Sequence, residues 1–232
     1  MEERFRILDL FCGAGGAAVG YHRAGFEVVG VDIAPQPNYP FEHYQADAVR
    51  WLRAWADGEF WYVQNTFDAI HASPPCQAFT SLKGMHNAKQ HDDLLTPTRE
   101  LLKATGLPYV IENVEGAPMR NPVMLCGSAF GLEAEGARLQ RHRLFETNFP
   151  LLSPGCAHGR ASRVIGVYGG HGRDRRRKVN TQDFSTDARR EAMGIDWMTG
   201  AELSQAIPPA YTEHIGTYLH RAIEHHPAKE RA

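Results

Sequence analysis

A cysteine and a glutamate in this chain each follow directly on a short apolar run that is typical of a buried strand. Cys76 stands in Ser73-Pro74-Pro75-Cys76-Gln77 after residues 67–72, and Glu112 opens Glu112-Asn113-Val114 after residues 109–111. The two prolines stiffen the first turn and remove backbone donors. They place the thiol at the carboxyl end of a strand, where open α/β sheets bind their ligands. We therefore predict that Cys76 is a nucleophile, the alternative being a structural cysteine.

Glu112 gains a chemical role only if its strand lies near the strand that carries Cys76. Both side chains would then emerge at one edge of the sheet. A thiol and a carboxyl group together suit attack on an electron-poor ring while a ring nitrogen is held or protonated. The alternative is a glutamate at a strand end in solvent.

A glycine-rich turn joins the first two expected strands, residues 5–10 and 28–31. Gly13, Gly15 and Gly16 precede a helical stretch, 17–24, and Asp32 ends the second strand. This arrangement lets a ligand approach the backbone and lets Asp32 accept hydrogen bonds from ribose hydroxyls, as an adenosine cofactor requires. The turn lacks the GxGxxG spacing of dinucleotide enzymes. That spacing serves to bind a pyrophosphate. S-adenosylmethionine carries a sulfonium and no pyrophosphate, so it does not need a phosphate-binding turn. The alternative is a tight turn with an ordinary exposed aspartate.

Strands alternate with helical patterns along most of the chain, which predicts a parallel sheet covered on both faces. A helix is expected before residue 109, capped by Thr96 and ended by Gly106. Residues 164–168 are expected to form a strand inside a loop-rich region. Thr199 and Glu202 fit a capping box, and a last amphipathic helix is expected over about 210–224.

The composition indicates an ordinary globular protein. The chain has 232 residues, 43% of them hydrophobic, and a formal net charge of −2. These values suit one domain, or one domain plus a small insertion, and exclude general disorder. Neither a membrane span nor a secretory signal is recognised, so an intracellular, reduced protein is expected. The cysteines at 12, 76, 126 and 156 are too widely spaced in sequence to predict a zinc site or a disulfide framework, and Cys156 and His158 supply only two ligands. No metal is expected.

The charges are distributed unevenly. Residues 138–190 hold 12 Lys or Arg and 4 Asp or Glu, whereas the rest of the chain holds 13 and 23. A basic block in an acidic chain indicates a surface for a polyanion such as nucleic acid, or else a solvated loop with arginines.

Five segments in this order resemble the motifs of the cytosine-C5 DNA methyltransferases, especially the compact methylases of bacteriophages. They are 9–16, 73–77, 112–114, Gln140-Arg141-His142-Arg143, and 190–216 with its closing His214-Ile215-Gly216. The resemblance implies an α/β, Rossmann-like class I S-adenosylmethionine-dependent methyltransferase fold with a reduced target-recognition region. Residues 1–146 would form the catalytic and cofactor-binding core, 147–185 a shortened, basic, loop-rich target-recognition region, and 186–232 the C-terminal helices that complete the core.

The same resemblance implies roles for particular residues. Cys76 would add to carbon 6 of a flipped-out cytosine, Glu112 would bind N3, and Arg143, with Arg141, would position the base. S-adenosylmethionine, converted to S-adenosylhomocysteine, would be held by Asp9, Phe11, Gly13, Gly15, Gly16, Asp32, Ile33, Asp47, Ala48, Pro75 and Thr217. Double-stranded DNA would be contacted by Gln77, Lys83, Arg173, Arg175, Arg176 and Arg177. A monomer in the cytoplasm of a bacterial host is expected.

Three departures from the family pattern bear on these expectations. The short region 147–185 leaves little room for base readers, so a short or relaxed target site is expected. Thr217 stands where the family usually has asparagine, which opens the alternative of a modified cofactor such as one carrying a carboxymethyl group. The arginine motif is one residue shorter than usual, which leaves the role of Gln140 open.

Three rival functions remain. The same chemistry could act on RNA, which a substrate test separates. A catalytically silent DNA-binding relative would have no need for Cys76, Glu112 and Arg143 together. A methyltransferase for a small molecule or a free nucleotide would have no need for the basic run at 173–178.

Overall fold

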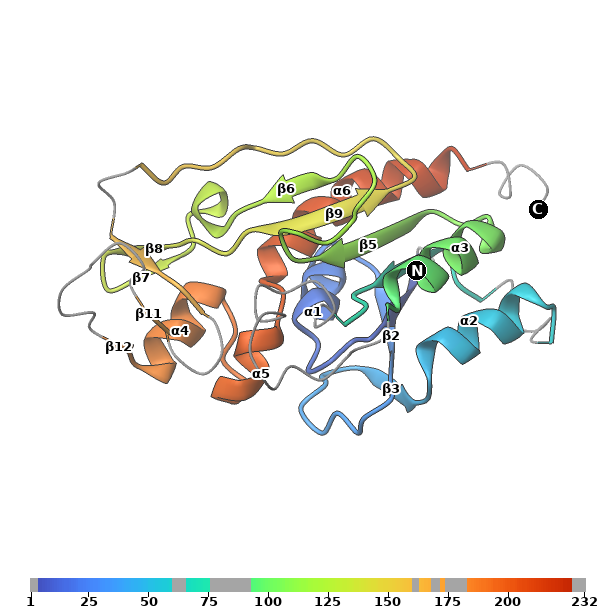
Figure 1. The fold of residues 1–232 in the computed structure, drawn as a ribbon, viewed down its shortest axis with the longest axis horizontal. Helices are drawn as coiled ribbons and strands as arrows, with labels where there is room; N and C mark the ends of the chain where they lie inside the picture. Colours follow the sequence, from blue (N-terminus) through green and yellow to red (C-terminus); the bar gives the residue numbers. More distant parts are fainter. Residues whose placement is uncertain are drawn as a thin grey trace.

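A computed structural model of the chain describes residues 4–59, 66–75, 93–159, 163–167, 172–173 and 183–226. Its main sheet has seven strands in the order β3-β2-β1-β4-β5-β9-β6 (Figure 1). The strands are β1 (Arg6–Leu10), β2 (Glu27–Asp32), β3 (Glu42–Gln45), β4 (Ala69–Ala72), β5 (Tyr109–Asn113), β6 (Val123–Leu125) and β9 (Arg143–Thr147). Strands β1 to β5 pair in parallel, and β9 runs antiparallel between β5 and β6.

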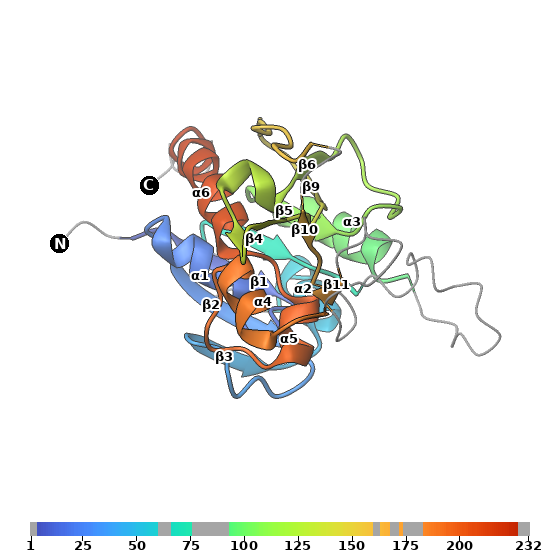
Figure 2. The ribbon, with the colours of Figure 1, turned by 90° about the vertical axis from the view of Figure 1, so that its left-hand side faces the viewer.

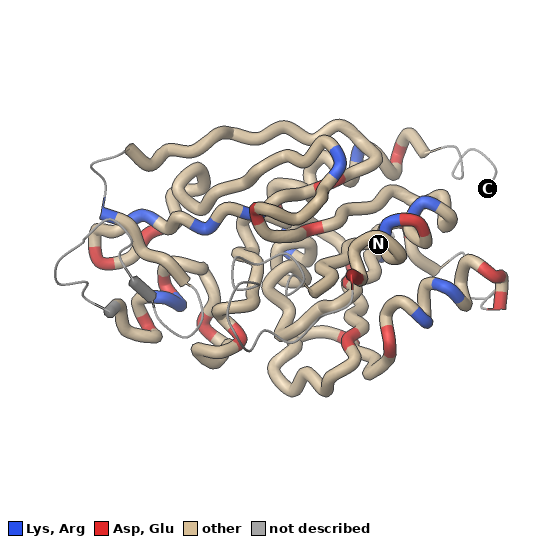
Figure 3. The backbone as a smooth tube through the Cα atoms, viewed as in Figure 1, with Lys and Arg blue, Asp and Glu red and all other residues tan. Residues whose placement is uncertain are grey.

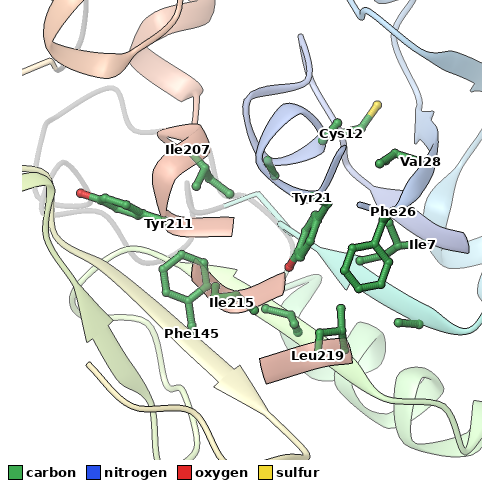
Figure 4. Packing of buried hydrophobic residues seen from close by; sticks show 14 of the residues in the cluster. Ile7, Cys12, Tyr21, Phe26, Val28, Phe145, Ile207, Tyr211, Ile215 and Leu219 are labelled. Atoms are coloured by element: carbon green, nitrogen blue, oxygen red, sulfur yellow. The ribbon is translucent and has the colours of Figure 1, made fainter. Parts of the chain in front are cut away.

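Helices cover both faces of this sheet, as Figures 1 and 2 show. Helices α1 (Gly16–Arg23) and α6 (Pro209–Glu224) pack together, as do α2 (Ala48–Ala56) and α3 (Leu95–Thr105). Alternate residues of β1 serve the two layers: Ile7 packs in the core with Tyr21 and Leu219 (Figure 4), whereas Leu8 packs in the core with α2 and α3. Burial on both faces explains why the inner strands β1, β2, β4 and β5 are mostly apolar, whereas the edge strand β3 is polar and largely exposed.

The two helices on the α1 face approach each other closely because their contact residues are small. A side chain at Gly20 would collide with Pro209 and Thr212, and one at Gly216 would collide with Ala24. The Thr212 hydroxyl donates to the Ala17 carbonyl at 2.8 Å across this interface. The C-terminal helix is thereby fixed to the helix that follows the glycine-rich turn.

A smaller lobe contains the sheet β10-β8-β7, with β7 (Glu133–Ala134), β8 (Ala137–Leu139) and β10 (Val164–Ile165). It also includes the 3-10 helix Gly127–Phe130, the pair β11 (Gly172–Arg173) and β12 (Asp183–Phe184), and the helices α4 (Thr186–Met193) and α5 (Gly200–Gln205). One core joins β7 and β8 to α4 and α5. The lobe thus contains residues from all three predicted segments, 1–146, 147–185 and 186–232. The boundaries of these segments stay a prediction.

The expected elements are largely present, with two corrections. The capping box of Thr199 and Glu202 is confirmed. Thr96 is not the cap of α3: Asp93 accepts hydrogen bonds from the backbone of Leu95 and Thr96, because it stands before the first turn. The strand expected at 164–168 is only Val164–Ile165 among the described residues. Of the helices that the structure describes, none combines the length and apolar character needed to cross a lipid bilayer.

Candidate active site

Three neighbouring strands bring the predicted chemistry to one edge of the sheet. Ala72 of β4 lies beside Ile111 of β5, and Glu112 lies beside Phe145 of β9. Because β4 and β5 are parallel, both end at this edge, and antiparallel β9 begins there. The condition for a chemical role of Glu112, that its strand lies beside the strand before Cys76, is met.

A cavity of about 360 Å³ opens at this edge, a volume within the usual range for a small-molecule site. One end is lined by residues of the glycine-rich turn and β2, the other by Ser73, Pro74, Pro75, Glu112 and Arg143. The cavity thus joins the predicted cofactor residues to the predicted catalytic residues in one continuous site.

Glu112 and Arg143 form a buried ion pair in this cavity. The Arg143 Nε atom lies 2.9 Å from Glu112 Oε1, and each side chain is 9% exposed. The contact lacks the direction of a hydrogen bond, since Oε1 has no hydrogen-bond partner. Burial raises the pKa of Glu112 above its usual value, although Arg143, Arg141 and Ser73 oppose the shift. A carboxyl group in this setting can hold or supply a proton at a ring nitrogen.

The Ser-Pro-Pro turn is held from two sides. Asn113 Nδ2 donates to the Pro74 carbonyl at 3.1 Å, which ties the turn to the end of β5. His71 is fully buried and lies between the Tyr21 hydroxyl, 3.0 Å from Nδ1, and the Ser73 hydroxyl, 2.8 Å from Nε2. Burial lowers the pKa of His71 to about 3, so the ring is neutral near pH 7. Sequence reasoning missed this role of His71, although a histidine in an apolar strand next to the Pro-Pro turn is a usable signal.

The glycine-rich turn and the end of β2 form the other end of the cavity. Asp32 accepts hydrogen bonds from the backbone of Gly13 at 3.0 Å and Ala34 at 2.9 Å, so its carboxylate is held beside the turn. Phe11 has a left-handed backbone with φ 57°, and Ile33 is 71% exposed although it lines the cavity. An exposed isoleucine beside a fixed carboxylate suits the two parts of a nucleoside, the flat base and the ribose hydroxyls.

Asp9 lines the cavity and is almost wholly buried, with 1% exposure. Its Oδ2 accepts a 3.4 Å hydrogen bond from the Tyr39 hydroxyl, and its Oδ1 has no hydrogen-bond partner. Burial raises the pKa of Asp9 to about 8, against the Tyr39 hydrogen bond, and the charge of Asp32 adds to the rise. A cation in the cavity would favour the ionised form of this carboxyl group.

Four predicted cofactor residues do not line the cavity, namely Gly15, Asp47, Ala48 and Thr217. Asp47 caps α2, where it accepts hydrogen bonds from the backbone of Val49 and Arg50, and Ala48 is buried in that helix. Thr217 is exposed on α6 and its hydroxyl donates to the carbonyl of His214. The alternative of a modified cofactor near Thr217 therefore has no support in the geometry.

A different part of the C-terminal region lines the cavity, namely Met198, Glu202, Ser204, Gln205, Ala206 and Ile207. Sequence reasoning missed this segment. The capping box at Thr199 and the Pro208-Pro209 pair at the start of α6 were usable signals, because they fix both ends of the connection between α5 and α6.

Arg141 holds that segment in place instead of entering the cavity. The side chain is fully buried, and its guanidinium donates to the carbonyls of Ala206 and Ser204 at 2.9 Å each and to that of Val167. All three nitrogens of the fork are directed at backbone carbonyls. Arg143, not Arg141, is therefore the arginine that the structure brings to the site.

Several predicted residues lie outside the described residues. These are the predicted nucleophile Cys76 and the predicted DNA contacts Gln77, Lys83, Arg175, Arg176 and Arg177. Arg173 is described only as backbone in β11. In the described part, α2 carries only basic charges, Arg50 and Arg53, whereas α3 carries charges of both signs (Figure 3).

Comparisons with known proteins agree with this geometry. The family model for the C-5 cytosine-specific DNA methylases matches residues 5–121. The fold is similar to that of a prophage-encoded DNA modification methyltransferase from E. coli, with 15% identity, a TM-score of 0.58, and coverage of 95% of this chain and 99% of that one. It is also similar to the S. pombe Dnmt2 methyltransferase, with 12% identity, a TM-score of 0.57 and coverage of 94% and 99%. No curated protein sequence matches the chain.

The strand order, with one antiparallel strand next to the last, and the cavity at the strand ends define a class I methyltransferase fold. The chain belongs to the C-5 cytosine-specific DNA methylase family, and its enzyme class is DNA (cytosine-5)-methyltransferase.

Asp9 gives the first prediction. Its folded pKa of about 8 lies above the usual 3.8, so the folded protein holds an extra proton between these pH values. The free energy of unfolding should therefore fall as pH rises from about 4 to about 8. Between pH 5 and pH 8, the free energy of unfolding should fall less in Asp9→Asn than in the wild type, by roughly 1–4 kcal/mol.

Chemical denaturation of both proteins at the two pH values measures this difference. The control is Asp196→Asn, at an exposed aspartate, which should change with pH as the wild type does. An equal pH dependence in Asp9→Asn and the wild type would contradict the shifted pKa.

The two arginines give a second prediction, because one holds the fold and the other faces the cavity. Arg141→Ala leaves three carbonyls in the interior without their donor, and should lower the free energy of unfolding by about 3 kcal/mol or more. Arg143→Ala should cost less stability, since Glu112 can take up a proton, but should lower methyl transfer per folded molecule by about 100-fold or more. Denaturation midpoints and transfer rates measured on both variants test this assignment. Equal stabilities would contradict it.

Proposed function

We propose that the protein transfers a methyl group from S-adenosylmethionine to carbon 5 of a flipped-out cytosine in double-stranded DNA, through a covalent adduct with Cys76. One observation carries this proposal. The buried Glu112–Arg143 pair lies at the edge of the sheet where the Ser73–Pro75 turn, whose next residue is Cys76, emerges into the same cavity.

Cys76, Glu112 and Arg143 together would activate the target cytosine for methyl transfer. Carbon 5 of cytosine is a poor nucleophile. Addition of the Cys76 thiolate to carbon 6 converts the ring to an enamine, whose carbon 5 can accept an electrophilic methyl group. Glu112 binds N3 and supplies a proton to it, and Arg143 stabilises the negative charge around the reacting groups. Loss of the carbon-5 proton to a base such as water then allows Cys76 to leave, which restores the aromatic ring.

The cavity residues fit S-adenosylmethionine, which when bound supplies an activated methyl group. Asp32 and Ile33 would hold its ribose and adenine, Phe11 and the turn at 13–16 would pack around it, and Pro75 would lie next to the reacting groups. The buried Asp9 Oδ1, which has no hydrogen-bond partner, suits a cationic ligand. The segment 204–207 also lines the cavity. Asp47, Ala48 and Thr217 have no part in this proposal.

DNA binding would require the target base to leave the helical stack, at a cost of a few kcal/mol. Gln77 and Lys83, which follow the nucleophile, are proposed to contact DNA, as are Arg173, Arg175, Arg176 and Arg177. These arginines would contact mainly phosphates, so a short or relaxed target sequence is expected. We further propose that the protein acts as a monomer in the cytoplasm of a bacterial host.

Two substitutions test the proposed mechanism. Cys76→Ala should abolish transfer of a labelled methyl group to DNA while leaving cofactor binding intact. Glu112→Gln should lower kcat by about 10²–10⁴-fold, because an amide does not supply a proton to N3. In the wild type, kcat should decline on the alkaline side as Glu112, whose pKa is raised, loses its proton. That decline should be absent from Glu112→Gln.

The matched control is Glu213→Gln, at an exposed glutamate of α6, which should transfer methyl groups at the wild-type rate. DNA that carries 5-fluorocytosine should form a stable adduct with the wild type and none with Cys76→Ala. Wild-type transfer by Cys76→Ala would exclude the covalent mechanism. An equal rate in Glu112→Gln and Glu213→Gln would exclude the role of Glu112.

A further inference from the structure

Two cysteines and two histidines, far apart in sequence, meet beside the candidate active site. Cys126 follows β6, His142 directly precedes β9, and Cys156 and His158 stand in the segment after β9. One ligand atom of each residue lies within 4.8 Å of the ligand atoms of the others. Cys126 is buried, the two histidines are half-buried and Cys156 is exposed. This group of four is called the CHCH cluster below.

Two of the distances between ligand atoms match those of a tetrahedral metal centre. The Nε2 atoms of His142 and His158 are 3.2 Å apart, and His142 Nε2 is 3.5 Å from Cys156 Sγ. Zn–N bonds of about 2.0–2.1 Å and Zn–S bonds of about 2.3 Å at tetrahedral angles give separations of about 3.3 Å for N···N and about 3.6 Å for N···S. The side chains are thus placed for one ion between them.

We propose that the CHCH cluster binds a structural Zn²⁺ ion. Two thiolates and two imidazoles are a donor set that zinc prefers, and four protein ligands leave no open position for catalysis. Both cysteines lose their thiol protons to solvent when the metal binds, so two negative charges balance the two positive charges of the ion. The histidines bind through Nε2 as neutral rings.

Neighbouring groups support the ligands as they do in known zinc sites. Glu115 Oε2 lies 3.3 Å from His142 Nδ1, so a carboxylate can orient the imidazole whose other nitrogen faces the metal. The Ser128 hydroxyl lies 3.3 Å from Cys126 Sγ and accepts a 3.1 Å hydrogen bond from the Ala157 backbone. Ser128 thus joins the buried cysteine to the backbone between Cys156 and His158.

The position of the CHCH cluster indicates which parts of the site the ion would stabilise. His142 stands between Arg141, which holds the segment at 204–206, and Arg143, which faces Glu112. Glu115 follows Val114, which lines the cavity. A metal here would fix the arginine motif against the end of β5, and would tie the start of the region at 147–185 to the catalytic edge.

Metal analysis of the full-length protein, purified without chelator, tests this proposal. Elemental mass spectrometry should find about one zinc per chain. Cys156→Ser and His158→Ala should each lose most of the zinc, and neither changes the buried core because Cys156 is exposed and His158 half-buried. His225→Ala, at an exposed histidine, should keep it. Exchange with Co²⁺ should give the visible absorption bands of a tetrahedral thiolate site in the wild type and the His225→Ala control only.

Three results would overturn the proposal: no zinc in the wild type together with no cobalt spectrum, unchanged zinc in both ligand variants, or a Cys126–Cys156 disulfide in protein kept under reducing conditions. None of these measurements depends on methyl-transfer activity. A protein that binds zinc but fails to methylate DNA would leave the zinc site established and remove only the proposed function.

Discussion

The meeting of three strand ends at one edge of the sheet is the constraint on which the site depends. Parallel β4 and β5 deliver the Ser73–Pro75 turn and Glu112 to this edge, and β9 must run antiparallel to bring Arg143 there. A second buried ion pair fixes β9: Arg99 of α3 binds both carboxylate oxygens of Glu146 at 2.7 and 2.9 Å. With Glu146 held by α3, Arg143 is held at the opposite end of the strand, next to Glu112.

The C-terminal region depends on the same edge although it is distant in sequence. Close packing of α6 on α1, which needs glycine at positions 20 and 216, brings the chain back over the sheet. Arg141 then holds the backbone at 204–206 against the core, so that this segment lines the cavity. One short motif, residues 140–143, thus supplies a cavity arginine, a structural arginine and, in our proposal, a zinc ligand.

Much of this arrangement could be predicted from the sequence because it is local. Apolar runs that end in Asp32, Ser73 and Glu112 indicate buried parallel strands, and their carboxyl ends mark the site. What could not be predicted depends on contacts between distant segments. The different roles of Arg141 and Arg143, the lining by residues 204–207, and the CHCH cluster arise only when the chain folds. The cysteines are far apart along the chain, which predicted no metal site, whereas Cys126 and Cys156 lie close together in space.

We propose that the site at the edge of the sheet where β4, β5 and β9 meet transfers a methyl group to cytosine in DNA. The most direct test is mass spectrometry of the nucleosides from unmodified double-stranded DNA after incubation with the purified protein and S-adenosylmethionine, beside an RNA sample treated in the same way. We expect 5-methylcytosine in the DNA, none in the RNA, and none in DNA treated with Cys76→Ala. Modification of RNA alone, or none in DNA with a wild type that binds both DNA and cofactor, would contradict this proposal.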